Sequence, residues 1–364
     1  MGNAGDSVRV ARGVLARLVT EIFSRAGVPA DDAAYLADSL VRADARGMHS
    51  HGVQRVSQYL PKIAAGGIKA GTHGKVASEN GAVVVIDGED GIGQLLSRHA
   101  MTLAIAKARA HGLGLALVRD SNHHGESGSY AMMAAREGMI GIVTSNGSPS
   151  APAWGGANPR VTGPWPLAIA APAMQEPVVL DMALGVVAKG RIQHYANTGQ
   201  KLPPGWGYDR TGVATEDPKA VLDGGWNAFI GDYKGWGLLL MIEVLTGVLS
   251  GGRIADEITD LFAGPAGSPQ GLSHFLLAIN VSAVQPSGGF AARMDGMIRK
   301  LKASELAAGS TEVLMPGERE FRNERRADTE GIMLAGGVAK DLHSAACKTG
   351  CPDDVIRAAF PALQ

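Results

Sequence analysis

The sequence has only two cysteines, Cys347 and Cys351, and they lie close together near the end of the chain. Two thiols at this spacing cannot join distant parts of a fold by a disulfide bond. A zinc site would need further ligands, and His343 is the neighbouring histidine that could supply one. The simpler interpretation is a pair of reduced cysteines, so no metal site is predicted.

Long apolar runs and an excess of one charge sign are also missing. No uninterrupted apolar stretch reaches the roughly 18 residues that would suggest a membrane span, and the N-terminus lacks the long apolar core of a signal peptide. With 34 basic and 35 acidic residues the formal net charge is −1, so no overall field favours nucleic acid or an anionic membrane. We therefore expect a cytoplasmic protein that acts on a small molecule, not on nucleic acid or a membrane.

Glycine and apolar residues, in contrast, are abundant. Glycine occurs 50 times in 364 residues and hydrophobic residues make up 45%, which is a globular composition with many tight turns. The length exceeds that of one usual core, so we expect two lobes or one large lobe with a helical annex. We place a helical lobe at residues 1–75, an α/β core at 76–325, and a C-terminal segment at 326–364 that packs back on the helical lobe.

The apolar pattern changes from helical to strand-like along the chain. Two amphipathic helices are predicted over residues 7–46, with a break at 27–29, and a third runs from Val53 until Pro61. After Lys75, short runs rich in Val and Ile alternate with alanine-rich helical segments, which is typical of an α/β fold. The expected strands include VVVIDG, GLALVRD, GIVTSN, PLAIAAP, VVLDMA and SHFLLAINV.

Histidines gather in two short segments. His49, Ser50 and His51 place three groups that can hold a proton within three residues, just past a predicted helix. An imidazole with an ordinary pKa exchanges a proton readily near neutral pH. His123 and His124 follow a predicted strand, at the position where open α/β sheets bind ligands. We hypothesise that the two segments meet in one active site.

Other interpretations of these histidines stay open. They could cap helices or bond to backbone, or the four imidazoles could hold a zinc ion in a metal-dependent lyase or hydrolase. No carboxylate lies at the HExxH spacing, however. A nucleophilic Ser50 with His51 as its base is disfavoured, because adjacent side chains rarely point at each other and no GxSxG turn surrounds the serine.

Groups that could bind an anionic ligand occur in two places. Arg55 is the natural anchor for a carboxylate, because a guanidinium binds it in a two-pronged, charge-assisted geometry. Tyr59 lies four residues on, on the same helical face. The Rossmann pattern GxGxxG between a strand and a helix is absent. A weaker phosphate site is the glycine turn of residues 231–237, whose amides start a helix beside Lys234.

Six motifs occur in the same order as in a known enzyme family. They read RGMHSHGVQRVSQY, RDSNHHGESGSY, VVLDMALGVVAKG, GDYKGWGLLLMIEVLTGVLSG, SHFLLAIN and MPGERE. The chain therefore resembles the malate/L-lactate dehydrogenase family, which includes sulfolactate and ureidoglycolate dehydrogenases and piperideine-2-carboxylate reductase. The resemblance implies a non-Rossmann nicotinamide-binding α/β fold with a central mixed sheet, a cofactor that is NAD or NADP, and a homodimer or higher homo-oligomer.

The resemblance also assigns roles to individual residues. It implies that Ser50 and His51 form a proton-transfer pair, and that His123 takes part in proton transfer or holds cofactor and substrate. Arg55 and Tyr59 would face the substrate acid. The implied contacts to the nicotinamide nucleotide are His123, Asp181, Met182, Ala183, Lys234, Gly235, Pro316, Gly317 and Glu318.

The chain departs from the family pattern at two positions. Where relatives read Gly-Thr-Asn-Pro beside the substrate, this chain has Trp165 between two prolines, so an apolar or planar substrate group becomes more plausible than a second carboxylate. Where imine reductases of the family have an acid, this chain has Arg191, which disfavours a Ser-His-Asp relay.

We therefore expect an NAD(P)-dependent dehydrogenase or reductase of a small 2-oxo or 2-hydroxy acid. In this interpretation His51 is the acid/base group and Arg55 binds the carboxylate. One alternative is a reductase of a cyclic imine 2-carboxylate. Another is the metal-dependent lyase or hydrolase built on the same histidines.

Overall fold

Two helices lie near the start of the described part of the chain, which covers residues 7–285 and 289–362 of the computed structural model. They are α1 (Arg12–Arg25) and α2 (Ala30–Ala45), and they are separated at Gly27, whose φ of +91° would strain any residue with a side chain. Both helices bury one face in a shared hydrophobic cluster that includes Leu18 and Leu36. The predicted pair of helices is thereby confirmed.

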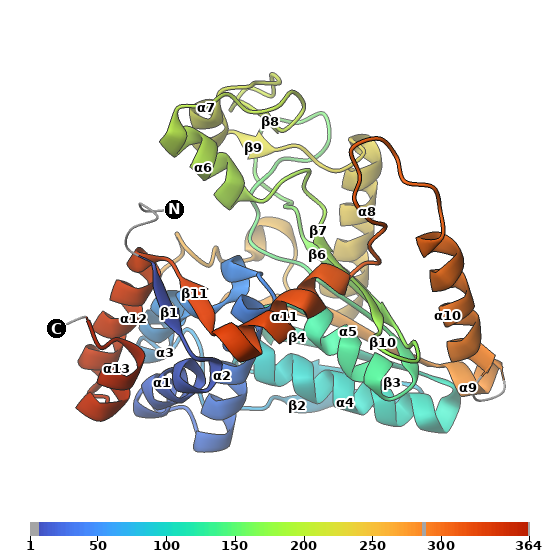
Figure 1. Ribbon diagram of the computed structural model, residues 1–364, viewed down its shortest axis with the longest axis horizontal. Coiled ribbons are helices and arrows are strands. Elements are labelled where there is room, and N and C mark those ends of the chain that lie inside the picture. The colour runs from blue at the N-terminus through green and yellow to red at the C-terminus, as the bar shows by residue number, and fades with distance from the viewer. Residues whose placement is uncertain (1–6, 286–288, 363–364) are drawn as a thin grey trace.

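The two ends of the chain meet in this helical region. β1 (Val8–Val10) pairs antiparallel with β11 (Ile332–Leu334), and α12 (Gly336–Thr349) and α13 (Asp353–Ala359) contact α1. Figure 1 shows these blue and red segments side by side. Apolar residues of the C-terminal helices, such as Phe360, belong to the same cluster as α1 and α2. Residues far apart in the sequence therefore share one core.

The helix after the first histidine segment extends further than predicted. Two 3-10 turns, His49–His51 and Val53–Arg55, lead into α3 (Val56–Ala64). The prediction that this helix ends at Pro61 is wrong, because Pro61 lies inside α3. A proline removes one helical hydrogen bond, and the buried face of the helix, which includes Tyr59, packs in the core and offsets that loss.

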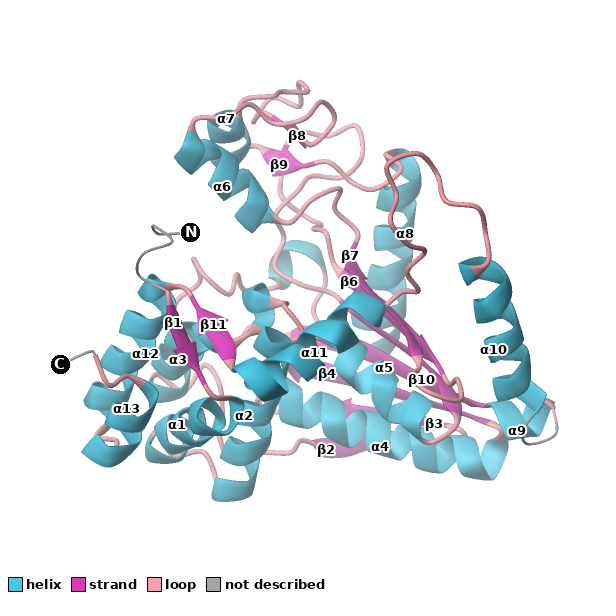
Figure 2. Ribbon diagram, viewed as in Figure 1, coloured by secondary structure: helices cyan, strands magenta, loops and turns pink. Residues whose placement is uncertain are grey.

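A seven-stranded mixed sheet forms the centre of the molecule (Figure 2). Its strand order is β2-β3-β4-β10-β5-β6-β7. β3 and β4 are parallel and are joined by α4 (Gly93–His111), whereas the other neighbours pair antiparallel. The expected α/β fold with a central mixed sheet is confirmed. The strands are β2 (Lys75–Asn80), β3 (Val83–Asp87), β4 (Leu113–Ser121), β5 (Met139–Ser145), β6 (Pro166–Ala171), β7 (Val178–Ala183) and β10 (Leu272–Asn280).

Helices α4 and α5 (Ser127–Arg136) lie against the sheet, in front of it in Figure 1. Small residues let the two layers approach closely. A side chain on Gly114 would place its Cβ 2.0 Å from the carbonyl oxygen of Ala104 in α4, and one on Gly141 would lie 2.4 Å from that of Ala131 in α5. This packing brings the first turn of α5 to the ends of the strands, where the candidate site lies.

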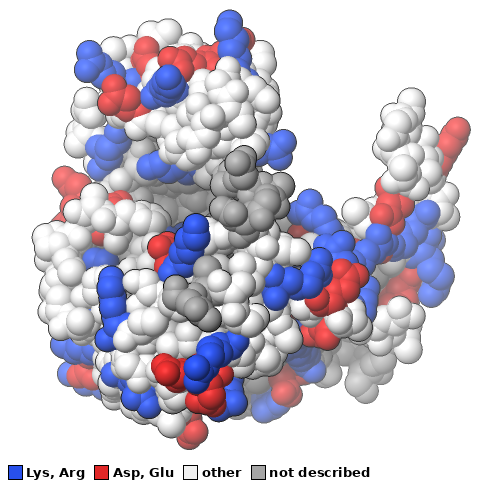
Figure 3. All heavy atoms as spheres, turned by 60° about the vertical axis from the view of Figure 1, so that its left-hand side comes forward, with Lys and Arg blue, Asp and Glu red and all other residues white. Residues whose placement is uncertain are grey.

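The chain beyond β7 includes a smaller region with its own cluster around Leu184 and Leu239. Its helix α8 (Tyr233–Glu243) follows the glycine turn as predicted and passes into a π-helical turn, Val244–Val248. Figure 3 shows a hollow between this region and the rest, and side chains of both charge signs are interspersed on that face. Among the described residues, no helix is long and apolar enough to cross a membrane. The other elements are α6 (Lys189–Thr198), β8 (Gly207–Tyr208), α7 (Pro218–Leu222), β9 (Trp226–Asn227), a 3-10 turn (Ala255–Glu257), α9 (Val281–Val284), α10 (Gly289–Lys302) and α11 (Glu318–Glu330).

Candidate active site

The first histidine segment is shaped by a buried carboxylate at the end of α2. Asp44 accepts a hydrogen bond from the backbone N–H of Val53 at 2.7 Å, and its other oxygen lies 2.8 Å from Nδ1 of His49. A side chain on Gly52 would collide with Asp44, with only 2.1 Å to its carboxylate oxygen. The bond to Asp44 raises the pKa of His49. His49 is therefore held by the turn and does not point at the second histidine segment.

His51 and His123 lie against each other, although 72 positions separate them. Their rings are stacked, with 5.5 Å between centroids and 15° between planes. The hypothesis that the two segments meet is confirmed by this contact. Ser50 Oγ lies 3.0 Å from Nδ1 of His51, so the expectation that these adjacent side chains do not point at each other is wrong. The tight 3-10 turn brings neighbouring side chains together, which an extended chain would not.

Hydrogen bonds fix which nitrogen of His123 carries the proton. Its Nδ1 lies 2.6 Å from the hydroxyl of Tyr59, and the backbone N–H of Gly125 donates to the same nitrogen at 3.4 Å. An N–H can point only at an unprotonated nitrogen, so Tyr59 donates as well and accepts in turn from Nε2 of Gln94 at 2.9 Å. His123 is thus held with its proton on Nε2, and no bond to that atom is found in the described ranges.

Both imidazoles are neutral near pH 7. Burial, followed by the nearby charge of Arg55, lowers the pKa of His51 to about 4. Burial, Arg55 and the neighbouring histidines lower the pKa of His123 well below its ordinary value. Burial likewise raises the pKa of Tyr59 to about 12, which keeps its hydroxyl protonated. A neutral His51 can accept a proton, and a neutral His123 can donate a hydrogen bond.

Arg55 lies beside this pair with its charge available. Its Nε donates to the carbonyl oxygen of Ser50 at 2.7 Å, which sets the plane of the guanidinium. Its carbon Cζ lies 5.0 Å from the ring centroid of Phe262. Within the described residues no carboxylate pairs with it. Burial lowers the pKa of Arg55, yet the group remains a cation whose two terminal nitrogens can grip a carboxylate.

Amides from distant segments hold the loop that carries His123. Gln270 Oε1 accepts from the backbone N–H of His123 at 2.8 Å, and Asn122 Oδ1 accepts from that of Gln270 at 3.2 Å. The side chain of Asn122 also donates to the carbonyl oxygens of residues 90 and 91. Sequence reasoning missed Gln94, Gln270 and Asn122. Nothing in their local spacing marks them, since their partners come from other strands and helices.

His124 belongs to a second stacked pair, with His274 of β10. Their rings are 4.3 Å apart between centroids and 12° between planes, and both are buried. His124 bonds to Ser97 and Ser127, each at 2.9 Å, and His274 bonds to Ser121 and Ser145, each at 2.8 Å. His124 therefore faces away from the first pair and into the sheet. In residues 7–285 and 289–362, no group of three His, Cys, Asp or Glu side chains is arranged to hold a metal ion.

The predicted cofactor segments converge on β7. Asp181 Oδ2 accepts from the backbone N–H of Gly128, in the first turn of α5, at 2.7 Å. At the start of the strand, the N–H of Val179 donates to the carbonyl oxygen of Pro316 at 3.0 Å. A side chain on Gly317 would bring its Cβ to 3.0 Å from Val179, so only glycine fits closely there. Three motifs that lie far apart in the sequence thus form one surface beside the second histidine segment.

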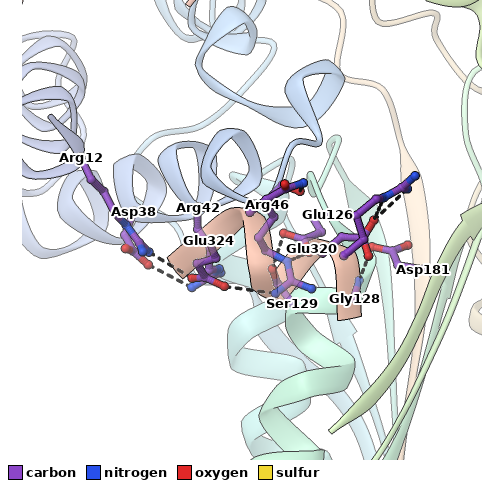
Figure 4. Close-up of polar contacts among 12 residues, drawn as sticks. Arg12, Asp38, Arg42, Arg46, Glu126, Gly128, Ser129, Asp181, Glu320 and Glu324 are labelled. Atoms are coloured by element: carbon purple, nitrogen blue, oxygen red, sulfur yellow. Dashed lines mark hydrogen bonds and ion pairs between the residues drawn. The ribbon is translucent and has the colours of Figure 1, made fainter. Parts of the chain in front are cut away.

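A buried ion pair stabilises this surface from behind (Figure 4). Arg46 Nε lies 3.0 Å from Glu126, both side chains are 1% exposed, and Arg46 also reaches Glu324 of α11 at 3.2 Å. In Figure 4, Glu126 and Asp181 lie on either side of the first turn of α5. Burial, and then the charge of Glu126, raises the pKa of Asp181 to about 7. Near neutral pH a large share of Asp181 is therefore uncharged, which lowers its repulsion of an anionic ligand.

The glycine turn before α8 is tied to the other end of β7. The N–H of Ile230 donates to the carbonyl oxygen of Leu184 at 3.0 Å. A Cβ on Gly235 would lie 2.0 Å from the carbonyl oxygen of Ile230, which excludes any side chain. Lys234 is exposed, with its amine 6.0 Å from the ring centroid of Tyr233. The turn thus places Lys234 and the start of α8 beyond the end of β7.

Glu318 is already engaged by basic residues. Lys302 reaches its oxygens at 2.6 and 2.8 Å, and Arg322 reaches it at 2.6 Å. Burial opposes its ionisation, but these bonds lower the pKa of Glu318 to about 2. Because the Glu318 carboxylate is already bonded to two basic side chains, we expect the backbone beside it to make the main contact with a ligand.

Within the described residues, neither of the two residues that depart from the family pattern bonds to His51 or His123. The indole of Trp165 is 4% exposed and donates to the carbonyl oxygen of Gly147 at 3.1 Å, inside the cluster of the smaller region. Little of its surface is free to touch a ligand. Arg191 is exposed in the first turn of α6, with its guanidinium 5.6 Å from the ring of Trp206.

Cys347 and Cys351 are both free thiols.

The mixed sheet without a Rossmann motif, together with paired histidines and an arginine beside it, defines an enzyme of the nicotinamide-dependent dehydrogenase and reductase class. The chain belongs to the malate/L-lactate dehydrogenase family, whose pattern it matches over residues 10–343. Its cofactor is accordingly NAD or NADP. This assignment gives no support to a metal-dependent lyase or hydrolase.

Individual relatives match along almost the whole chain. Malate dehydrogenase of Pyrococcus abyssi is 36% identical over 350 residues, covering 94% of this chain and 95% of that protein. Ureidoglycolate dehydrogenase (NAD(+)) of Escherichia coli K12 is 31% identical over 344 residues, covering 93% and 95%. The structure of sulfolactate dehydrogenase from Methanocaldococcus jannaschii superposes with a TM-score of 0.88 at 31% identity, covering 94% and 98%.

Proposed function

We propose that the protein transfers a hydride between a nicotinamide cofactor and a small 2-oxo or 2-hydroxy acid. The observation that carries the proposal is the stacked pair of His51 and His123 beside the unpaired cation of Arg55. A proton-transfer group and a carboxylate anchor are the two things that this reaction requires of the protein. His51 and Arg55 lie on adjoining 3-10 turns, and His123 meets them from the loop after β4.

The two imidazoles have different roles in this proposal. His123, held with its proton on Nε2 by Tyr59 and Gly125, donates a hydrogen bond to the substrate oxygen. His51 is neutral and takes the proton from the hydroxyl when a hydroxy acid is oxidised; in reduction it returns that proton. Ser50, bonded to Nδ1 of His51, orients the ring. Arg55 holds the substrate carboxylate with its two terminal nitrogens.

The surface around β7 fits a dinucleotide. Asp181, Met182 and Ala183, the Pro316–Glu318 turn and the Lys234–Gly235 turn would hold it, because close glycines let backbone amides reach phosphate oxygens and Lys234 supplies a cation. The nicotinamide ring supplies or accepts the hydride when bound. His123 would lie between cofactor and substrate, since the segment that follows it opens α5, where Asp181 is bonded.

A cyclic imine 2-carboxylate is the second substrate class that we test. It needs the same carboxylate anchor and the same proton donor. The position where an acid would complete a relay carries the exposed Arg191 instead, so we expect oxo acids to be the better substrates.

We also propose that a second copy of the chain covers α8. Leu238, Leu240 and Met241 of this helix are 47–52% exposed, and Val248 and Leu249 continue the apolar surface at 55% and 52%. So large an apolar surface on one helix is typical of a subunit contact. Analytical ultracentrifugation should give a dimer or a larger even assembly, and Leu240→Asp should shift it toward monomer. A monomeric wild-type protein would contradict this.

The decisive experiment is an absorbance assay at 340 nm with NADH and NADPH against a panel of 2-oxo acids and cyclic imine carboxylates. We expect oxidation of one reduced cofactor with at least one oxo acid, and much slower oxidation with every imine. His51→Ala should lower the rate of oxidation by roughly 10²- to 10⁴-fold without changing the circular dichroism spectrum. If no member of either class oxidises either cofactor while the cofactor still binds, the proposed function is wrong.

A further inference from the structure

We infer that Phe262 determines the substrate class of this site, by favouring 2-oxo monoacids with an apolar or planar substituent over those with a second acidic group. The inference rests on the proposed function of Arg55. Its starting point is the contact between the Arg55 guanidinium and the Phe262 ring, 5.0 Å from Cζ to centroid. A cation within about 6 Å of a ring face is attracted to it.

The position of Phe262 is set by the loop that carries it. Asp260 Oδ1 accepts from the backbone N–H groups of Phe262 and Ala263, each at 2.7 Å. Leu261 is buried in the core of the helical lobe, and its N–H donates to Ser148 Oγ at 3.0 Å. These bonds fix the backbone on both sides of Phe262.

The same loop is packed against the helix that follows Arg55. A Cβ on Gly67 would lie only 2.2 Å from the carbonyl oxygen of Ala266. The amine of Lys62, in α3, reaches the carbonyl oxygen of Pro265 at 3.5 Å. The backbone segments that carry Phe262 and Arg55 are thus parts of one packed unit.

Phe262 is 66% exposed, although it is a large aromatic residue. Nε of Arg55 is occupied by the carbonyl oxygen of Ser50, so the guanidinium plane is fixed and its two terminal nitrogens remain for a carboxylate. A substrate held there by its carboxylate would extend its substituent along the exposed ring. An apolar or planar substituent would bind more tightly, because it buries the Phe262 ring. A second carboxylate or a sulfonate would lie against that ring, which offers no hydrogen-bond donor.

The test compares a substrate series in the full-length protein. We expect kcat/KM of the wild type to rise from pyruvate through 2-oxobutanoate to 2-oxopentanoate, by up to about fourfold for each methylene that becomes buried, and oxaloacetate to be the poorer substrate. Phe262→Ala should flatten this series by raising KM for the longer acids, with kcat for pyruvate within about threefold of wild type. Phe262→Leu should keep part of the preference, because it retains an apolar surface.

Met174→Ala is the matched control, since Met174 is 69% exposed and lies far along the chain on another loop; it should leave every ratio unchanged. Three results would overturn the inference. The wild type could prefer oxaloacetate, or Phe262→Ala could lower kcat/KM equally for all substrates. A changed sedimentation mass of Phe262→Ala would instead make Phe262 a subunit contact. A wild type that reduces no oxo acid would instead overturn the proposed function, so the two failures are distinguishable.

Discussion

The molecule contains two stacked pairs of histidines that differ in what their ring nitrogens do. In the pair of His51 and His123, hydrogen bonds occupy Nδ1 of each ring, and within the described residues no partner reaches either Nε2. In the pair of His124 and His274, serines occupy all four ring nitrogens. Stacking alone therefore does not mark a reactive histidine. The pair that we propose to be reactive differs in that each ring keeps Nε2 available near the cation of Arg55.

The buried pair has a structural role that its position explains. His274 joins β10 to Ser121 at the end of β4 and to Ser145 at the end of β5. Ser145 also donates to the carbonyl oxygen of Asn146 at 2.7 Å, and Ser121 donates to that of Asn122 at 3.3 Å, so both serines link the ring to the backbone. The pair thus ties the start of β10 to the ends of β4 and β5, and the loop of His123 follows directly after β4.

The largest expected effect is on the reactive pair. His51→Ala should lower kcat by roughly 10²- to 10⁴-fold, because it removes the acid/base group and leaves the substrate anchor in place. Steady-state oxidation of the reduced cofactor measures this. His49→Ala is the matched control, since His49 is bonded to Asp44 and its side chain is 56% exposed; its kcat should stay within about threefold. Wild-type turnover by His51→Ala would remove His51 from the mechanism.

The next effect concerns the cation beside the reactive pair. Arg55→Lys should raise KM for the oxo acid by about 10- to 100-fold with little change in kcat, because lysine cannot hold a carboxylate with two parallel bonds. Initial rates over a range of substrate concentrations measure it. Arg98→Lys changes an arginine that also lies over an aromatic ring, Tyr35 at 4.3 Å, and should leave KM unchanged. Equal KM values for both variants would mean that Arg55 does not bind substrate.

Removal of the buried pair should act on stability. His274→Ala should lower the free energy of unfolding by about 2–4 kcal/mol, because it opens a cavity and leaves the hydroxyls of Ser121 and Ser145 without their partner. Urea denaturation followed by fluorescence measures it. His194→Ala, on the exposed surface of α6, should change it by less than about 0.5 kcal/mol. If both variants unfold at the same urea concentration, the serine bonds contribute nothing.

The smallest effect is the pH dependence of that stability. Burial lowers the pKa of His274 to about 3, whereas in the unfolded chain it keeps its ordinary value of 6.5. The unfolded state therefore binds a proton first, so this contribution to stability is complete above pH 6.5 and is lost as the pH falls toward 3. Between pH 7.5 and 5.5 the loss from this one group should be about 1.4 kcal/mol. In His274→Asn the urea midpoint should fall less over the same interval; an equal fall would assign the pH dependence to other groups.

Sequence patterns predicted the parts of this fold that depend on neighbouring residues. The breaks between helices and the strand segments of the core followed from local periodicity, and motif order selected His51, His123, Arg55 and Tyr59 as candidate site residues. They did not reveal His274, which looks like one polar residue in an apolar strand. The end of α3 was also misplaced, because packing of its buried face outweighs the cost of Pro61.

By itself, the sequence determined which segments become helix or strand, which family the motifs resemble, and which residue types are available for proton transfer and carboxylate binding. Only the tertiary structure decided which histidines pair with which. β10 lies between β4 and β5, and that insertion, which no local pattern encodes, brings His274 to His124 and leaves His51 for His123. The protonation states follow from burial and from partners far away along the chain, because desolvation and hydrogen bonding depend on what surrounds a group in space and not on its neighbours in sequence.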